Sequence, residues 1–283
     1  MYDSTALILE GGGMRGTFTA GVLDYWLDRN ILFDRVYGVS AGACQACSYL
    51  CGQRGRAIRV WTTYCGDKRF CSFSSLLRTG DYFNADFNYH QLPDILEPLD
   101  NERFLNGSSR FFAVVTDLET GLAEYPEVRD MRKDVALVQA SSSLPLLSRP
   151  VRVNGRKYLD GGVADSIPLA RAIRDGSRKQ VLVLTQPAGY RKSPNRLLPL
   201  IGLRYKAYPA FVSAMRSRHA RYNQVLDQIE SLEREGKIFV LRPDDTAGVG
   251  RIEKDPDKLR ALYDSGYETA KRADGKLAEY LND

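Results

Sequence analysis

Short apolar runs alternate along the chain with longer segments whose apolar residues recur at helical spacing. The run TALILE at 5–10 is typical of a buried strand. After it, four apolar side chains share one face of a predicted helix over 19–29. Strands separated by helices favour a mainly parallel sheet covered on both faces, so the pattern predicts an α/β fold.

The same reading assigns most of the chain to regular elements. The predicted strands are 5–10, 35–39, 111–116, 181–185 and 238–241, with 122–125 as a hairpin partner of 111–116. Residues 157–159 are a short piece that leads into a Gly-Gly turn. The predicted helices are 19–29, 41–51, 55–64, 134–140, 168–174, 208–235 and 256–281. Residues 66–90 are predicted to be irregular. No repeat or low-complexity linker divides the chain, and its 283 residues fit a single α/β domain.

A Gly-x-Ser-x-Gly pentapeptide, from Gly38 to Gly42, lies where the second predicted strand ends and a helix begins. Glycines at these two positions leave room for a very tight turn, which lifts the Ser40 hydroxyl above the sheet. The free N–H groups of the following helix point at the same place and favour developing negative charge. The context therefore favours a catalytic serine over a serine that only caps a turn.

A glycine-rich loop follows the first predicted strand. Its candidate ligand-binding residues are Gly11, Gly12, Gly13, Arg15 and Gly16. Backbone N–H groups without side chains around them can form an oxyanion hole for acyl transfer, and Arg15 can add positive charge or brace the loop. The glycines also fit a dinucleotide fingerprint, but that site needs an acidic residue where the second strand ends, and the serine turn stands there.

A serine nucleophile needs a base, and the chain contains two histidines, His90 and His219. His219 lies in an arginine-rich helix, where a solvated face is the simpler interpretation, and His90 lies in the irregular region. A Ser40, Asp160, His219 triad would follow the order of α/β-hydrolases. The nucleophile of that fold normally follows several strands, whereas Ser40 follows the second.

An acidic residue is the other candidate base. Asp160 precedes Gly161 and Gly162 after a short apolar piece, and the two glycines let its carboxyl face a cleft with little crowding. Asp-Gly is also a common turn pair, so this motif taken alone favours a plain turn aspartate. A carboxylate can accept a proton from serine if the site is partly dry.

Together, GGGMRG, GVSAG, ASSSLP at 140–145 and DGG resemble the patatin-like phospholipase family, especially its bacterial members. The resemblance implies a three-layer α/β/α fold and hydrolysis of fatty-acyl esters of lipids or phospholipids, as in a phospholipase A or carboxylic ester hydrolase. It implies that Ser40 is the nucleophile, that Asp160 is the base and that the glycine loop forms the oxyanion hole. It also implies that the reaction passes through an acyl-enzyme and needs no cofactor or metal. It covers most of the chain, as one domain over 1–283 with a helical extension from about 251. A non-catalytic lipid-binding protein of this fold stays open.

The segment 187–226 holds eight Lys or Arg residues and no Asp or Glu, interleaved with apolar residues, while the whole chain is net +5. One hypothesis makes it a basic, apolar flap that meets an anionic lipid surface or holds acidic headgroups. The other makes it an ordinary helix whose arginines pair with carboxylates elsewhere. The aromatic residues within 67–90 fit a mobile lid, an acyl-pocket wall or a packed loop.

All five cysteines fall between Cys44 and Cys71. Three of them, at 44, 47 and 51, share one helical face, and core packing is the favoured interpretation over a metal or cluster site. The first ten residues lack a basic n-region, and no run of 18 apolar residues occurs. We therefore expect reduced thiols in a cytoplasmic protein, peripheral to a membrane at most, with an acyl lipid as partner and no nucleic acid.

Overall fold

A nine-stranded sheet forms the centre of the computed structural model, which describes residues 2–283. Seven strands lie in the order β6-β7-β3-β2-β1-β8-β9, and the short β4 and β5 pair with β3. Neighbours from β3 to β9 are parallel, whereas β6, β7 and β3 pair antiparallel. The strands are β1 (Tyr2–Leu9), β2 (Phe33–Val39), β3 (Arg110–Asp117), β4 (Ala123–Glu124), β5 (Glu127–Val128), β6 (Val151–Val153), β7 (Arg156–Asp160), β8 (Lys179–Val183) and β9 (Phe239–Leu241).

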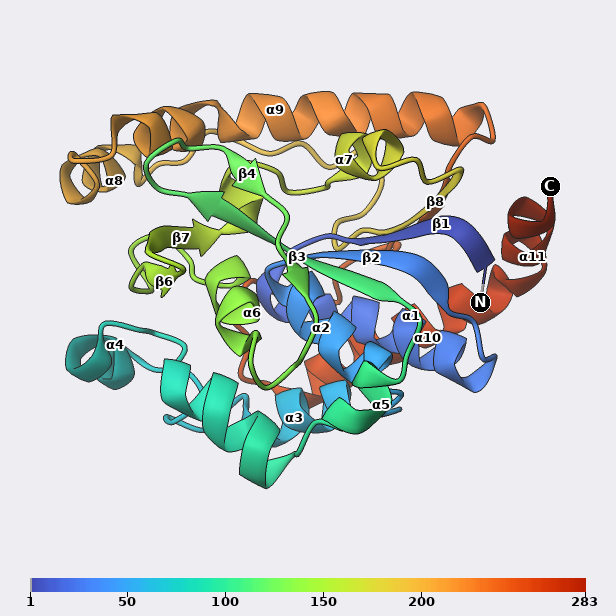
Figure 1. Ribbon diagram of the computed structural model, residues 1–283, viewed down its shortest axis with the longest axis horizontal. Coiled ribbons are helices and arrows are strands. Elements are labelled where there is room, and N and C mark those ends of the chain that lie inside the picture. The colour runs from blue at the N-terminus through green and yellow to red at the C-terminus, as the bar shows by residue number, and fades with distance from the viewer. Residues whose placement is uncertain (1) are drawn as a thin grey trace.

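Helices cover both faces of the sheet, which gives the predicted three layers (Figure 1). One face carries α7 (Leu169–Arg174), α8 (Leu198–Arg204) and α9 (Pro209–Arg234). The other face carries α1 (Gly16–Asp28), α2 (Ala41–Leu50), α3 (Arg56–Tyr64), α5 (Asn101–Leu105), α6 (Val135–Ser141) and α10 (Pro256–Arg272). The remaining helical elements are η1 (Gly13–Arg15), α4 (Phe73–Thr79), η2 (Phe87–Leu96), η3 (Gly161–Val163) and α11 (Asp274–Asn282).

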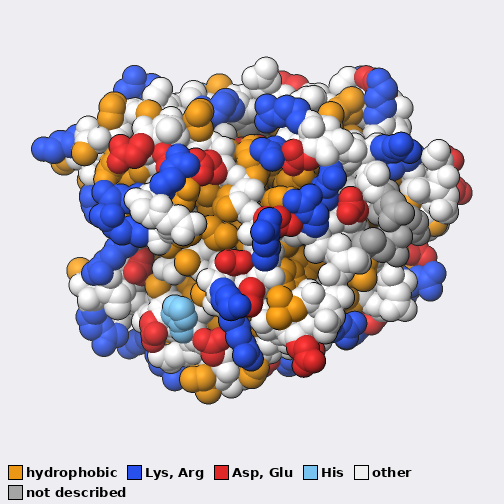
Figure 2. Space-filling view, in the orientation of Figure 1, with side chains coloured by type: hydrophobic (Ala, Val, Ile, Leu, Met, Phe, Trp, Pro, Cys, Tyr) orange, Lys and Arg blue, Asp and Glu red, His pale blue; other side chains and the backbone are white. Residues whose placement is uncertain are grey.

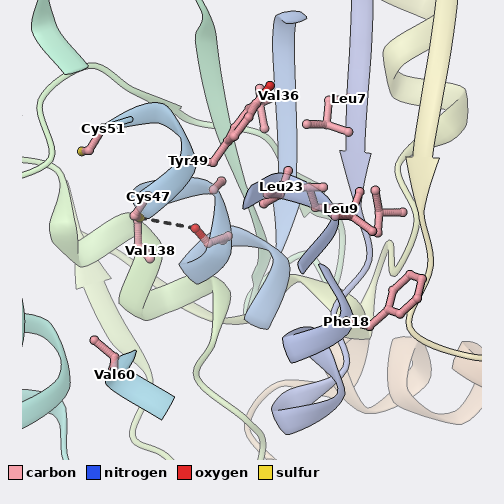
Figure 3. Packing of buried hydrophobic residues seen from close by; sticks show 14 of the residues in the cluster. Leu7, Leu9, Phe18, Leu23, Val36, Cys47, Tyr49, Cys51, Val60 and Val138 are labelled. Carbon is pink, nitrogen blue, oxygen red and sulfur yellow. Dashed lines mark hydrogen bonds between the residues drawn. The ribbon is translucent and has the colours of Figure 1, made fainter. Parts of the chain in front are cut away.

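The alternation of side chains along β1 explains why its second half, from Ala6 to Leu9, is a continuous apolar run. Leu7 and Leu9 point into the core shared with α1 and α2, where Phe18 joins them (Figure 3). Ala6 and Ile8 point the opposite way, into the core beneath α9. All four β1 side chains are fully buried. A central parallel strand is covered on both faces, so its sequence is a continuous apolar run. This run is the pattern from which the buried strand at 5–10 is predicted.

The candidate site is positioned by the carboxyl ends of these parallel strands. β1 runs into the glycine loop, and β2 runs into Ser40. β8, on the other side of β1, leads to Thr185. Parallel strands end at one edge of a sheet, so three loops distant in sequence meet there, as expected for ligand sites in open α/β sheets.

The structure differs from the predicted elements in several places. Residues 66–90 are irregular only in part, because α4 and the start of η2 lie within them. The signals for α4 were local: the Ser72 hydroxyl accepts from Ser75 N–H (3.0 Å) at its start, and Gly80 ends it at φ +84°. The predicted helix 256–281 is divided at Ala273 into α10 and α11. Among the regular elements, α5, α8, β5, β6 and β7 have no counterpart in the predicted set.

Two of the three cysteines predicted to share a helical face, Cys47 and Cys51, pack in the core as expected, whereas Cys44 is partly buried and its thiol contacts the Ser142 hydroxyl (3.3 Å). Cys47 and Cys51 are buried among apolar residues, and the Cys47 thiol donates to the Ala43 carbonyl (3.3 Å; Figure 3). Burial raises the pKa of Cys51 to about 12, so this thiol stays protonated. Over residues 2–283, no cluster of His, Cys, Asp and Glu is suited to a metal ion, and no helix is both long and apolar enough to cross a bilayer.

Candidate active site

Ser40 occupies a strained turn between β2 and α2. Its backbone lies at φ 54° and ψ −123°, a conformation that L residues seldom adopt. The Ser40 N–H donates to the Ser141 hydroxyl (2.9 Å), and its carbonyl accepts from Ala43 N–H (2.9 Å), which holds the turn from both sides. Such strain persists only where the surroundings enforce it, and it is a feature of nucleophile elbows.

Both glycines of the pentapeptide are required by close approach of neighbouring backbone. A Cβ on Gly38 would lie 2.6 Å from the Ala43 Cα, and one on Gly42 would collide with the Leu9 carbonyl oxygen. The first turn of α2 is therefore pressed against the ends of β1 and β2. This places the amino end of α2 directly beneath the Ser40 side chain, as the sequence predicted.

Asp160 lies at the end of β7, and both it and Ser40 line one cavity. Its side chain is 3 % exposed. Oδ1 accepts from Gly162 N–H (2.7 Å), and the Thr116 hydroxyl donates to the Asp160 main-chain carbonyl (2.9 Å). Gly161 cannot carry a side chain, because a Cβ there would collide with the carbonyl of Val114. The DGG motif thus clamps one carboxylate oxygen and leaves the other available.

That second oxygen, Oδ2, is buried and has no partner with full hydrogen-bond geometry within residues 2–283. Burial raises the pKa of Asp160, and interaction with the Ser40 hydroxyl and then the charge of Arg218 oppose this rise. The two side chains are therefore close enough to interact without forming a tight hydrogen bond. Contacts between a catalytic nucleophile and its base often tighten only when substrate is bound.

The glycine loop lies directly against the serine turn, since a Cβ on Gly11 would come within 2.7 Å of the Ser40 Cβ. The N–H groups of Gly12 and Gly13 have no acceptor in the described part of the chain. Met14 N–H is not free, because it donates to the Arg251 carbonyl (3.0 Å). These two backbone donors therefore remain available beside Ser40.

The other two predicted loop residues have separate positions. Gly16 starts α1 and packs beside α2, where its added Cβ would lie 3.0 Å from the Ala41 Cβ. Arg15 lines the cavity that contains Ser40 and Asp160, and its Nε is buried without a partner among the described residues. Arg15 does not brace the loop through that nitrogen, so its charge is directed at the cavity.

Two cavities meet at Ser40. The larger holds about 1060 Å³ of empty space, partly open to solvent, and runs between α2, α3, η2 and α6. Its walls are mainly apolar and include Val60, Leu92 and Val138. The smaller holds about 470 Å³ and contains Ser40 and Asp160 among mostly polar residues. An amphiphile with its ester at Ser40 could place an apolar and a polar part in separate spaces.

Aromatic residues of the 67–90 segment form part of the larger cavity's wall. Phe70, Phe83 and Tyr89 line it. Phe70 and Phe83 also pack edge-on against each other, with ring centroids 6.1 Å apart. Phe70 and Phe83 therefore pack within the segment and also form part of the cavity wall, so the two interpretations do not exclude each other.

Neither histidine is part of this arrangement. His90 is exposed on η2, and His219 is half-buried on α9. Neither residue lines the two cavities that contain Ser40. The structure brings Ser40 and Asp160 together and leaves His219 out.

The eight basic residues of segment 187–226 have different surroundings. Arg191 pairs with Asp227 and Glu230, whereas Arg221 donates to main-chain carbonyls of Val163 and Ala214. Two others, Lys192 and Arg218, line the smaller cavity. The exposed remainder comprises Arg196, Arg204, Lys206 and Arg216. Neither sequence hypothesis describes the whole segment.

Several supporting residues carried no recognisable signal in the sequence. Ser141, which holds the Ser40 N–H, was visible only as part of the 140–145 segment. Glu10 belongs to no recognisable motif, yet it is 2 % exposed and accepts from Thr185 N–H (2.7 Å) and Tyr222 O–H (2.5 Å). These contacts tie the end of β1 to β8 and α9, and pairs so far apart in sequence leave no local pattern.

Comparison with known proteins gives matches over most of the chain. The model of the patatin-like phospholipase family matches residues 7–173, and that of a domain of unknown function, DUF6363, matches 208–282. The uncharacterized protein YjjU of Escherichia coli is 28% identical over 244 residues, which is 84% of this chain and 68% of YjjU.

Two mycobacterial proteins are also similar over the amino-terminal part. The uncharacterized NTE family proteins Rv2565 of Mycobacterium tuberculosis and Mb2594 of Mycobacterium bovis are each 28% identical over 171 residues. The match covers 58% of this chain and 27% of either relative. Among solved structures, VipD from Legionella pneumophila superposes over 98% of this chain and 66% of its own, with 14% identity and a TM-score of 0.49.

Proposed function

The chain belongs to the patatin-like phospholipase family, and from this premise we propose that it is a serine acyl-hydrolase that cleaves fatty-acyl esters of lipids, phospholipids among them. The observation that carries the proposal is the meeting of a strained serine, a buried carboxylate with one unoccupied oxygen, and two free backbone donors around one cavity. This combination supplies a nucleophile, a base and an oxyanion hole, which together are what acyl transfer requires.

In the proposed acylation step, Asp160 Oδ2 takes the proton of the Ser40 hydroxyl as Oγ attacks the ester carbonyl carbon. The carbonyl oxygen becomes an oxyanion, which the N–H groups of Gly12 and Gly13 and the amino end of α2 stabilise. The tetrahedral intermediate then collapses. The bond to the alcohol breaks, and Asp160 returns its proton to the leaving oxygen, so that an acyl-serine remains.

In the proposed deacylation step, a water molecule gives its proton to Asp160 and its oxygen attacks the acyl-serine carbonyl. The same donors stabilise the second oxyanion. Collapse releases the fatty acid, and Ser40 recovers its proton from Asp160. The raised pKa of Asp160 supports this cycle, because a carboxylate with a higher pKa is a stronger base.

The larger cavity is suited to the acyl chain. It follows α2 from Ser40 to Ser48, eight residues further along, which corresponds to about 12 Å at the helical rise of 1.5 Å per residue. Apolar walls along this path remove methylene groups from water at about 0.8 kcal/mol each. A long acyl chain therefore gains binding free energy that a short acyl group does not.

Contact with a membrane surface is the second part of the proposal. Two short helices, α4 and α8, project at the same end of the molecule (Figure 1) and expose large apolar side chains. Leu77 on α4 is 87 % exposed, and Leu200 and Leu203 on α8 are 52 % and 70 % exposed. Basic side chains gather at this end as well (Figure 2). Exposed apolar residues beside basic ones are typical of surfaces that bind anionic lipid.

Hydrolysis of a p-nitrophenyl acyl ester tests the enzymatic part. We expect Ser40→Ala and Asp160→Asn each to lower kcat by about 10³-fold or more while the circular dichroism spectrum and Tm remain those of a folded protein. His219→Gln serves as the matched control and should stay within about twofold of wild type. An active Asp160→Asn protein, or an inactive His219→Gln protein, would refute the dyad.

Flotation with vesicles tests the membrane part separately. The wild type should float with vesicles that contain anionic lipid, and the double variant Leu200→Asp, Leu203→Asp should not. Ile173→Asp is the control, because Ile173 is 43 % exposed on α7, away from this end. Equal flotation of the double variant and wild type would contradict a role for α8.

A further inference from the structure

Four cationic side chains converge on the smaller cavity beside Ser40. They are Arg15 from η1, Lys192 from the loop before α8, Arg218 from α9 and Arg251 from the loop before α10. The four come from segments that are far apart in sequence and meet only because α9 and the loop before α10 pack over the edge of the sheet. We call this group the cationic cluster.

The cationic cluster is not neutralised by the protein. Within residues 2–283, no carboxylate forms an ion pair with any of its members. Glu10 also lines the cavity, but both of its oxygens accept hydrogen bonds from Thr185 and Tyr222. Asp160 is the other acid there. The three arginines alone outnumber the two carboxylates, and protonated Lys192 adds to the excess of positive charge in a space that is partly shielded from water.

Lys192 in particular is held in place despite this repulsion. The Asn223 side chain accepts from the Lys192 N–H (2.8 Å) and donates to its carbonyl (3.1 Å), which fixes the backbone. Its ammonium lies 3.9 Å from the centroid of the Tyr222 ring. Burial, followed by the charge of Arg218, lowers the pKa of Lys192 to about 7. The charge of Lys192 is disfavoured at a position that the backbone fixes, so this residue does not serve to stabilise the fold. Its position instead points to a role in binding a ligand.

The position of the cationic cluster indicates what it binds. Gly13, Ser40 and Leu144 line both cavities, so the apolar space and the cationic space join at the nucleophile. An ester whose acyl chain lies along α2 therefore directs its alcohol part toward the cationic cluster. An anionic group on that alcohol would supply the missing negative charge and form charge-assisted hydrogen bonds.

We propose that the cationic cluster binds a phosphate or carboxylate on the alcohol side of the substrate, so that the protein prefers acyl esters with an anionic headgroup to neutral ones. The proposal rests on the acyl-hydrolase function proposed above and names the substrate class of the same site. It assigns Lys192 and Arg251 as specificity-determining residues, whereas Arg218 also contacts the Gly162 carbonyl through Nε and has a structural part.

Two substrates that differ only in charge test this proposal. They are a 1-acylglycerol and the corresponding 1-acylglycerol 3-phosphate, with the same acyl chain and below their aggregation concentrations. We expect wild type to have a kcat/KM about tenfold or more higher for the phosphate-bearing ester. Lys192→Met and Arg251→Met should each reduce that ratio several-fold. Arg196→Met, which removes an exposed charge of the same segment, should leave the ratio unchanged.

Three results would overturn the proposal. The first is equal kcat/KM for the two esters in wild type. The second is a phosphate preference that both methionine variants retain in full. The third is inhibition of neutral-ester hydrolysis by inorganic phosphate without any headgroup preference, which would make the cavity a site for a free anion.

Binding to the Ser40→Ala protein keeps this inference distinct from the proposed hydrolysis. Calorimetry with the same two amphiphiles requires no turnover. Tighter binding of the phosphate-bearing amphiphile that is lost in Ser40→Ala, Lys192→Met supports the cationic cluster even if no ester is hydrolysed by wild type. Equal binding of both amphiphiles, with hydrolysis intact, overturns the inference and leaves the hydrolase proposal standing.

Discussion

Replacing Lys192 by methionine should make the protein more stable at pH 6, and this advantage should shrink as the pH rises to 9. The folded protein holds Lys192 where burial and neighbouring arginines lower its pKa from 10.5 to about 7. Between these two values the unfolded chain binds more protons at this site than the folded one. Stability of wild type therefore rises with pH across that window. Methionine keeps the apolar stem and carries no charge, so it avoids the cost.

The size of this free-energy effect follows from the difference between the pKa of Lys192 in the unfolded chain and in the folded protein. A difference of one pKa unit is worth about 1.36 kcal/mol, so a shift from 10.5 to about 7 corresponds to a penalty on the order of 4–5 kcal/mol at pH 6. At pH 9 the folded lysine is already neutral, and the remaining penalty is about 2 kcal/mol. The change between the two pH values is thus about 2.5 kcal/mol at most. Lys192 is half-buried, and solvent screening reduces the expected change to about 1 kcal/mol.

Urea unfolding of wild type and Lys192→Met at pH 6 and pH 9 measures this effect. Titrations of other groups occur in both proteins and cancel in the difference between them. We expect the variant's advantage in unfolding free energy to be about 1 kcal/mol larger at pH 6 than at pH 9. A variant that is less stable than wild type at pH 6, or a difference independent of pH, would show that Lys192 is a stabilising residue and refute this reasoning.

Two further predictions concern catalysis. As the proposed base, Asp160 must be ionised to accept a proton, and burial raises its pKa. In a pH–rate profile, kcat/KM should therefore fall toward acid with a midpoint above the ordinary aspartate pKa of 3.8. A midpoint at or below 3.8 would contradict the assignment of Asp160 as the base. Val138→Trp should fill the apolar cavity and lower kcat/KM for a twelve-carbon p-nitrophenyl ester about tenfold or more. The kcat/KM for p-nitrophenyl acetate should stay near that of wild type. An equal fall in kcat/KM for both esters would show that the acyl chain does not lie in this cavity.

The fold and the strained turn at Ser40 could be predicted from the sequence because their signals are local. The second half of β1, from Ala6 to Leu9, is apolar because both of its faces are buried. The turn at Ser40 needs glycines within two residues on either side. The pairing of Ser40 with Asp160 had no such signal. The two are 120 positions apart and meet through the pairing of β7 with β3, so only the family resemblance suggested it.

The cationic cluster could not be predicted as a site. Lys192 and Arg218 stood in a basic segment whose eight charges looked alike in the sequence, and nothing distinguished them from the exposed Arg196. Arg251 lies outside that segment. Their convergence depends on where α9 and the loop before α10 pack over the strand ends. Such tertiary packing follows from the whole core rather than from any local pattern.

Covalent labelling of Ser40 tests the central claim, a Ser40–Asp160 dyad, most directly. A fluorophosphonate probe should add to wild type once, with the modified peptide containing Ser40, and should not add to Ser40→Ala. Because Asp160 must remove the proton of the nucleophile, Asp160→Asn should react about 10²-fold more slowly or worse, whereas His219→Gln should react at the wild-type rate. Labelling of Asp160→Asn as fast as wild type, or loss of labelling in His219→Gln, would contradict the dyad.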